Sequence, residues 1–307
     1  MSLLGTPELW ALTLSMSTPI ACGALGGTFS ERTGVVNIAM EGMMTSGAFI
    51  AVMGSYVTGD PWLGLAMAMV AGGLMALLFA WATIRFRANQ VVTGMAIDIL
   101  ATGLTGYLLN TVYGYNGTPV NTPSLPYVNI RALGHIPFFG TVFNQQSVLV
   151  YIFLAILVLS HLFLFKTPLG LRMRSVGENP RAADSAGLNV FKLRYAGVVM
   201  SGLLSGMGGA FLSIGILNSF NIGMVNGRGF IALAAMIFGN WTPWGSYLAA
   251  LIFGFATALG MQLQNTSTIP KDLVLMLPYL LTIAALALAV RRSSPPAADG
   301  IPYDPGE

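Results

Sequence analysis

The sequence predicts an all-α polytopic membrane protein with about nine transmembrane helices. Only 8% of the residues are charged and 55% belong to the hydrophobic set, whereas soluble domains carry roughly a quarter charged residues. The apolar residues stand in long runs rather than alternating with polar ones, which favours helices over a β-barrel. A cluster of Lys and Arg between residues 166 and 194 indicates the cytoplasmic side, because short basic loops stay inside.

Long apolar runs define the expected spans, since about 20 apolar residues cross the roughly 30 Å hydrocarbon core. Polar breaks separate these runs near residue 31, at the turn 58–61, and at the arginines near residue 86. The loop 114–147 contains Pro and Gly and is too irregular to span, and the seventh run is short. The expected spans cover about 9–29, 38–57, 62–84, 88–113, 148–165, 195–217, 229–239, 244–262 and 273–290.

Counting crossings from the basic loop gives a consistent topology. The N-terminus and the loop 114–147 fall outside, and the loop 166–194 falls inside together with the arginines near residue 86 and at 291–292. We therefore expect a transmembrane domain over residues 1–292. The Pro-rich end, 293–307, is expected to be a disordered cytoplasmic tail.

The two halves of the chain contain a candidate inverted repeat. The stretch AlaLeuGlyGlyThrPhe at 24–29 and the following 37–42 resemble GlyMetGlyGlyAlaPhe at 206–211 and the following 221–227. In the expected topology the two copies enter from opposite sides, and opposed Gly-interrupted segments build the pathway of many transporters. Chance similarity between Gly-rich apolar runs is the alternative.

The basic loop contains a short helix with signals at both ends. Asn179 and Pro180 supply a cap and a first-turn proline, and Gly187 ends the helix. A capped helix on a cytoplasmic loop offers a soluble partner a rigid contact. The plainer interpretation is a solvated loop that follows the positive-inside rule.

Polar residues inside the spans are the candidate pathway residues, because ionisable groups there are costly unless they face a partner or water. Asp98 either lines a pathway or joins helices by hydrogen bonds. For Glu41 we favour hydrogen bonds to exposed backbone amides, and Arg228 either anchors at the interface or caps carbonyls. Neutral amides suited to an uncharged polar solute are Asn89, Asn110, Asn218 and Asn221.

Motifs for catalysis are absent from the sequence. It contains no GxxxxGK[ST] phosphate loop, no HExxH, no CxxC and no GxSxG, and its two histidines lack ligand-like spacing. We expect no enzyme activity, no metal and no cofactor in this chain, and no binding of nucleic acid. The charge excess reflects basic cytoplasmic loops.

Four ordered stretches resemble a known family. They are ERTGVVNIAMEGMM (31–44), ANQVVTGMAIDILATGLT (88–105), LRMRSVGENPRAADSAGLNV (171–190) and GRGFIALAAMIFGNWTPWG (227–245). Together they look like the permease subunits of bacterial ABC importers of the branched-chain amino acid/ribose permease superfamily, and within it like the nucleoside-type importers. Asp98 departs from the pattern, because Asn is expected there.

The resemblance implies an ABC importer permease fold in the bacterial inner membrane and a set of partners. These are a separate ATPase that binds ATP and Mg, a second permease subunit and an extracytoplasmic binding lipoprotein. Carried over to this chain, the coupling helix that docks on the ATPase, its caps and its approach comprise Arg172, Arg174, Gly177, Glu178, Asn179, Pro180, Ala183 and Gly187. Ala183 would then face a close-packed partner surface.

The main expectation is transport of nucleosides, and the first alternative is a simple-sugar permease of the ribose type. From another class, a secondary transporter would use Asp98 and Glu41 as proton carriers. A scaffold or an intramembrane enzyme ranks below these.

Overall fold

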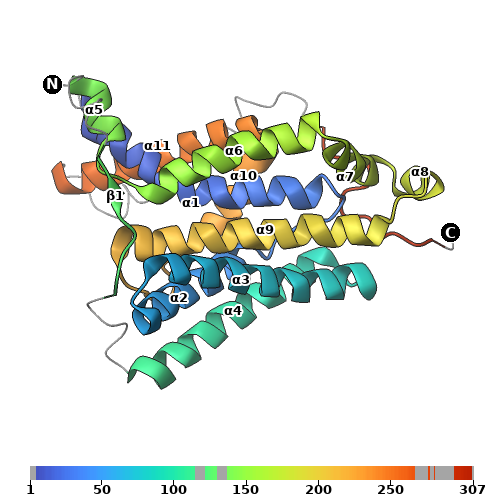
Figure 1. Ribbon diagram of the computed structural model, residues 1–307, viewed down its shortest axis with the longest axis horizontal. Helices are drawn as coiled ribbons and strands as arrows, with labels where there is room; N and C mark the ends of the chain where they lie inside the picture. The colour runs from blue at the N-terminus through green and yellow to red at the C-terminus, as the bar shows by residue number, and fades with distance from the viewer. Residues whose placement is uncertain are drawn as a thin grey trace.

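The computed structural model describes residues 5–114, 122–129, 137–266, 276, 280 and 294–305. The described chain is an elongated bundle of helices (Figure 1). The helices are α1 (Pro7–Glu31), α2 (Met40–Thr58), α3 (Pro61–Ala80), α4 (Gln90–Tyr113), α5 (Pro137–Phe143), α6 (Val148–Lys166), α7 (Pro168–Glu178), α8 (Pro180–Ser185), α9 (Val190–Leu212), α10 (Arg228–Phe238) and α11 (Pro243–Thr266). One π-helical turn, Trp81–Arg85, extends α3, and another, Ser213–Leu217, extends α9.

Six of the described helices are long and apolar enough to cross a membrane by length and composition. They cover Pro7–Glu31, Pro61–Arg85, Gln90–Tyr113, Val148–Lys166, Val190–Leu217 and Pro243–Gln264. Helix α10 has 11 residues, or about 16 Å at 1.5 Å per residue, too short to cross alone. The expected ninth span, 273–290, lies outside the described residues apart from two positions, so nine crossings are not confirmed.

Helix α9 lies at the centre of the bundle, and its small residues let neighbouring helices pack closely (Figure 1). A Cβ atom built on Gly206 would lie 2.4 Å from the carbonyl oxygen of Ala68 in α3, and one on Gly209 would lie 2.0 Å from that of Met44 in α2. On the α1 side, a Cβ on Gly26 would lie 2.8 Å from the carbonyl oxygen of Ser201. Three helix backbones thus approach α9 at distances that only glycine permits.

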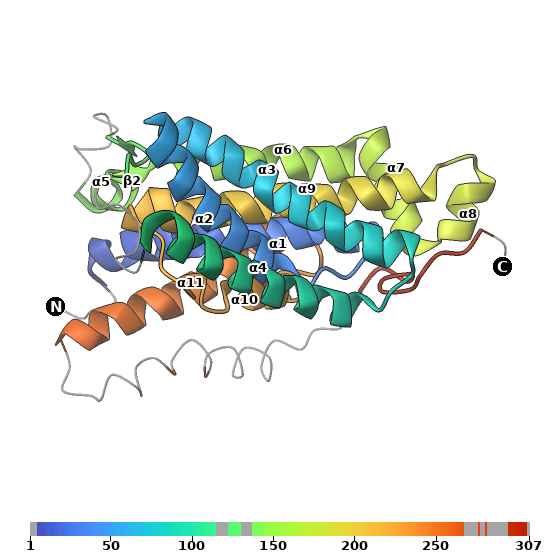
Figure 2. The same cartoon turned by 90° about the horizontal axis from the view of Figure 1, so that it is seen from below.

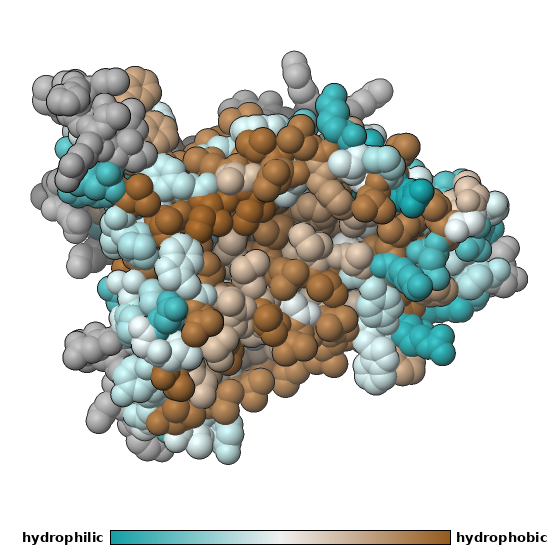
Figure 3. Space-filling view, viewed as in Figure 1, coloured by the Kyte–Doolittle hydropathy of each residue, from teal (hydrophilic) through white to brown (hydrophobic). Residues whose placement is uncertain are grey.

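The two ends of the bundle differ in character (Figure 2). At the β1 end, strand β1 (Tyr127–Val128) pairs antiparallel with β2 (Gln146–Ser147), close to α5. At the α8 end lie α7, α8 and residues 294–305. Between the ends, the visible face is a broad apolar band, with hydrophilic residues gathered at the α8 end (Figure 3). The segments predicted to be cytoplasmic therefore meet at one end.

The C-terminal segment differs from its prediction. Composition indicated disorder over 293–307, yet residues 294–305 pack against the α8 end. The backbone N–H of Ala298 donates to the carbonyl of Gly177 at 2.9 Å, and Tyr303 is 6% exposed. Backbone pairing and burial of one aromatic ring order a Pro-rich stretch that has little local preference for structure.

Candidate functional site

The starts of α2 and α10 meet inside the bundle, and Glu41 joins them. Its Oε1 accepts a hydrogen bond from the backbone N–H of Gly227 at 2.8 Å, and its Oε2 accepts one from Gly229 at 2.7 Å. A Cβ on Gly229 would lie 2.4 Å from the backbone nitrogen of Glu41, so the two helix starts touch. Glu41 thus caps the first turn of α10, where unpaired N–H groups favour a carboxylate. These are the backbone amide contacts that we favoured for Glu41.

Asp98 caps the first turn of α2, as Glu41 caps the first turn of α10. Its Oδ1 accepts a hydrogen bond from the backbone N–H of Gly42 at 2.7 Å, whereas its Oδ2 is buried without a hydrogen-bond partner among the described residues. One turn earlier on α4, Gly94 packs against the backbone at Ala39. One turn before that, Gln90 Oε1 accepts from the N–H of Val36 at 2.7 Å.

This stripe on α4 holds the break between α1 and α2, and we had not identified all of it from the sequence. Gln90, Gly94 and Asp98 recur every four residues, so they share one helix face. That spacing was the available signal. Asn37, also missed, supports the break from the other side by donating to Ser201 Oγ of α9 at 2.8 Å.

The remaining pathway candidates lie in four different places. Arg228 lies at the junction, and its Nη1 donates to the carbonyls of Met224 and Val225 at 3.0 Å, which is the carbonyl-capping role. Asn218 and Asn221 lie exposed in the connection from α9 to α10. Asn89 caps α4 by accepting from Val91 and Val92, close to the α8 end and apart from the junction. Asn110 lies exposed in the last turns of α4.

The two broken segments approach the junction from opposite ends of the bundle. The connection from α1 to α2 starts at the α8 end, where Arg32 Nε donates to the carbonyl of Trp241 at 2.8 Å. The connection from α9 to α10 starts at the β1 end, where the carbonyl of Ile214 accepts from the N–H of Leu125. Opposed half-helices of this kind are the geometry that an inverted repeat predicts. The repeat itself remains a prediction.

The basic loop folds into two helices. Helix α8 occupies the predicted place: Asn179 Oδ1 accepts from the N–H of Ala182 at 3.0 Å, Pro180 is its first residue, and Gly187 follows with φ +80°. Helix α7 was missed, although Thr167 followed by Pro168 is a start signal of the same kind; Thr167 Oγ1 accepts from Gly170 at 3.1 Å.

The face that α8 presents outward is not the one expected. Ala183 is 4% exposed and packs with Val176, Val190 and Tyr303 of its own chain, so it does not face a partner. The exposed residues of α8 and the following turn are Arg181, Ala182, Asp184, Ser185, Ala186 and Gly187. Residues three or four apart share one face of a helix, and in a helix as short as α8 the face that packs against the chain contains Ala183.

The predicted approach to α8 holds α7 against the bundle. Arg174 Nε donates to the carbonyl of Leu164 at 2.9 Å, and its guanidinium lies 4.8 Å from the centre of the Phe165 ring, a cation–π contact. A Cβ on Gly177 would lie 2.4 Å from the carbonyl oxygen of Arg32. Glu178 faces the Arg32 guanidinium at 4.0 Å, and burial lowers the pKa of Arg32. Arg172 is exposed.

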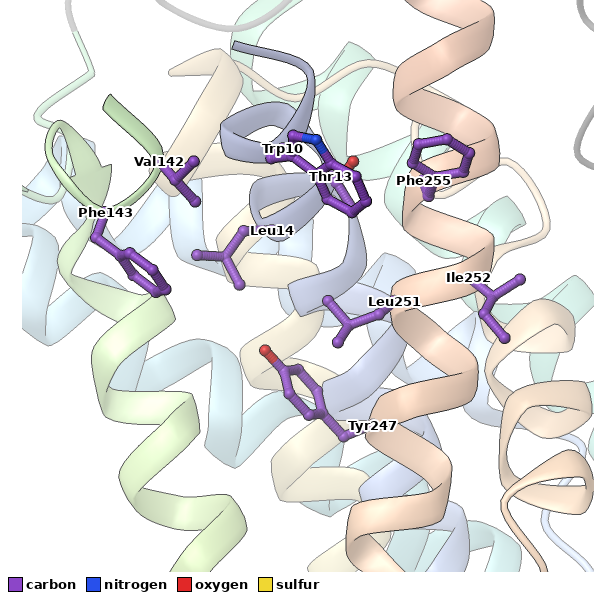
Figure 4. A pocket seen from close by; sticks show the side chains of 9 residues that line it. All are labelled: Trp10, Thr13, Leu14, Val142, Phe143, Tyr247, Leu251, Ile252 and Phe255. Atoms are coloured by element: carbon purple, nitrogen blue, oxygen red, sulfur yellow. The ribbon is translucent and has the colours of Figure 1, made fainter. Parts of the chain in front are cut away.

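An apolar pocket of 480 Å³ lies near the β1 end, between α1, the end of α5 and α11 (Figure 4). Its hydroxyl groups belong to Thr13 and Tyr247, and that of Thr13 donates to the carbonyl of Leu9 in its own helix. The other lining residues are Trp10, Leu14, Val142, Phe143, Leu251, Ile252 and Phe255. Such walls suit hydrocarbon and offer little to a polar solute.

Comparison with known proteins agrees with this architecture. Residues 10–286 match the family model described as the permease component of the branched-chain amino acid transport system. The chain is 45% identical to the guanosine ABC transporter permease protein NupQ of Bacillus subtilis, with 96% of each chain covered. It is 40% identical to the nucleoside ABC transporter permease protein NupC of Lactococcus lactis, with 94% of each covered.

A solved structure shares the fold. It is a metal-chelate type ABC transporter in an inward-facing conformation, which matches with a TM-score of 0.50 at 18% identity and covers 92% of this chain and 85% of that one. The family match spans all the described long helices that surround the α2–α10 junction. The chain is therefore a multi-pass membrane protein that belongs to the family of branched-chain amino acid transport system permease components.

Proposed function

We propose that this chain is the membrane-spanning permease subunit of an ATP-driven nucleoside importer in the bacterial inner membrane. The observation that carries the proposal is the 45% identity to a guanosine permease over 96% of both chains. The α2–α10 junction supports it, because Glu41 and Asp98 there both accept hydrogen bonds from backbone amides. An uncharged polar solute suits such a pathway.

The proposed partners follow from the same role. A separate ATPase subunit binds ATP and Mg and docks on α8, a second permease completes the pathway, and an extracytoplasmic binding lipoprotein delivers the solute. Helix α8 supports the docking role because it is capped at both ends and exposes Arg181, Ala182 and Ser185. A rigid displacement of α8 reaches the junction through α9, which follows it after a short turn and contacts α1, α2 and α3.

Uptake measurements test the solute and the energy source together. Cells that lack the subunit and cells that carry it are given labelled guanosine, adenosine and ribose. We expect nucleoside uptake that depends on the subunit and on ATP but persists when an uncoupler dissipates the proton gradient. Uptake of ribose alone would favour the simple-sugar permease, and loss of uptake with the uncoupler at constant ATP would favour the secondary transporter.

Replacing either of two neighbouring alanines by tryptophan tests docking on α8. Ala182→Trp places a large side chain on the exposed face, so we expect normal abundance of the subunit and loss of ATP-driven uptake. Ala183→Trp overpacks the buried side, typically by about 1–3 kcal/mol, so we expect a less stable subunit. Normal uptake in the Ala182→Trp variant would contradict docking and favour the interpretation of α8 as part of a solvated loop.

Gly187 provides a second test of α8. Its φ of +80° costs a β-branched residue about 1 kcal/mol or more, and no atom lies within 4 Å of a Cβ built there. Gly187→Val should therefore weaken the coupling of transport to ATP hydrolysis by straining the backbone at the end of α8, without a steric clash. Gly187→Asn is the matched control, because Asn tolerates this conformation and should retain uptake.

A further inference from the structure

Residues 294–305 form a strap across the α8 end, fixed by contacts to several helices. The N–H of Ser294 donates to Asn240 Oδ1, in the turn after α10, at 3.1 Å. The N–H of Ala298 donates to the carbonyl of Gly177, at the end of α7, at 2.9 Å. Near the far end of the strap, Asp304 pairs with Arg87, which follows α3. The strap thus connects segments that lie far apart in the sequence.

The middle of the strap is anchored on a buried arginine of α9. Arg194 is 2% exposed, and its Nη1 donates to the carbonyl of Ile301 at 2.9 Å. Gly34 makes room for this contact: with φ +86°, its Cβ would lie 3.0 Å from Arg194 Nη2 and 3.1 Å from the carbonyl oxygen of Ala298. Asp299 lies close to Arg194 and Glu31, and burial raises its pKa to about 6.

Tyr303 connects the strap to α8. Its ring packs with Val176, Ala183 and Val190, and its centre lies 5.6 Å from that of Phe191. Its hydroxyl lies near the carboxylate of Asp184 on α8. Ala183 is the residue of α8 whose side chain is buried, so Tyr303 supplies much of the surface against which α8 rests.

We propose that the strap, residues 294–305, holds α8 in the orientation that transmits force, and that Tyr303 is its positioning residue. The proposal rests on the proposed function, in which α8 docks on an ATPase. A six-residue helix is too short to be stable by itself. Through Arg194 and Tyr303 the strap ties α8 to α9, so that a push on α8 moves α9 instead of bending the loop.

The test uses the complete importer, with ATPase, second permease and binding protein, reconstituted in lipid vesicles. The variants are Tyr303→Ala, Tyr303→Phe and a chain that stops before Ser294. Ile301→Ala is the matched control: its side chain is 55% exposed, and the substitution keeps the carbonyl that Arg194 contacts. The measurements are the amount of assembled complex, its melting temperature, and the solute transported per ATP hydrolysed.

We expect Tyr303→Ala and the truncated chain to assemble in normal amount but to lose most of the transport per ATP. Tyr303→Phe keeps the ring and should restore much of it, and Ile301→Ala should match the wild type. A fall in abundance and melting temperature at unchanged transport per ATP would overturn the positioning role, because a purely structural role predicts that result. Wild-type behaviour of Tyr303→Ala in all three measurements would overturn it too.

Hydrogen exchange separates this proposal from the proposed function. The N–H of Ala186 donates to the carbonyl of Ala182 at 3.1 Å, and that of Leu188 to Ala183 at 3.1 Å. Tyr303→Ala should speed exchange at these two amides whatever solute the importer carries. Unchanged exchange would refute the strap even if nucleoside uptake were established, and absence of nucleoside uptake in the wild type would refute the proposed function alone.

Discussion

Replacing Glu41 should destabilise the protein more than any loss of a surface carboxylate, because Glu41 holds two helix starts together. In Glu41→Ala the N–H groups of Gly227 and Gly229 lose the acceptors that now lie 2.8 Å and 2.7 Å away. A buried N–H left without a partner costs about 1–3 kcal/mol, so the loss is about 2–6 kcal/mol. Glu41 is partly exposed, which favours the lower half of that range because water replaces part of the lost bonding.

Glu41→Gln refines the estimate. The amide keeps one carbonyl oxygen as acceptor, but its NH₂ group faces the other backbone N–H and cannot accept from it. About half of the effect, roughly 1–3 kcal/mol, should remain. Stability should therefore rank wild type, then Gln, then Ala.

The assay is the melting temperature of the purified subunit in detergent together with uptake in cells. Glu8→Ala is the matched control, because Glu8 is exposed in the first turn of α1 and contributes about 0.3–1 kcal/mol through the helix dipole. A melting temperature of Glu41→Ala equal to that of Glu8→Ala would refute the capping argument. Full stability of Glu41→Gln with complete loss of uptake would instead indicate a proton carrier.

The other predictions concern packing, Asp98 and topology. Gly206→Ala places a Cβ 2.4 Å from a backbone carbonyl oxygen of α3, so it should lower the free energy of unfolding by about 1–3 kcal/mol. Gly103→Ala is the control, because no atom lies within 4 Å of its Cβ, and it should be neutral or stabilise by up to about 1 kcal/mol. The melting temperatures of the two variants check this. Asp98→Asn keeps an oxygen for the α2 cap and should retain uptake, so that collapse of uptake would assign the carboxylate a role beyond capping. A reporter fused after Arg174 should be cytoplasmic and one near Asn121 external; finding both on one side would contradict the helix order.

Local sequence patterns predicted the positions of many of the helices. The start of α8 at Asn179 and Pro180 and its end at Gly187 depend on residues within one turn of each boundary, and capping chemistry acts over that range. Long apolar runs likewise placed α1, α2, α3, α4, α6, α9, α10 and α11 to within a few residues. Helix α7 was not predicted, although its start signal, Thr167-Pro168, is equally local.

Crossing number and tail order were harder to predict for a different reason. Hydropathy identified 229–239 as a short apolar run, but it does not show whether such a run crosses the membrane or ends inside the bundle, as the 11-residue α10 does. The order of residues 294–305 depends on their contacts with α7, α8 and α9. A Pro-rich composition indicates weak local preference, and it carries no information about a docking surface elsewhere in the chain.

The sequence by itself determined that this is a helical membrane protein, which end of the bundle is basic, and which family it resembles, because composition and motif order are properties of the chain. Only the tertiary structure decided what the polar residues contact. The Gly227 and Gly229 amides that Glu41 caps lie 186 and 188 positions away, and Ala183 turned inward because Tyr303, far along the chain, covers it. No local pattern specifies such partners, because they are brought together by the packing of helices around α9.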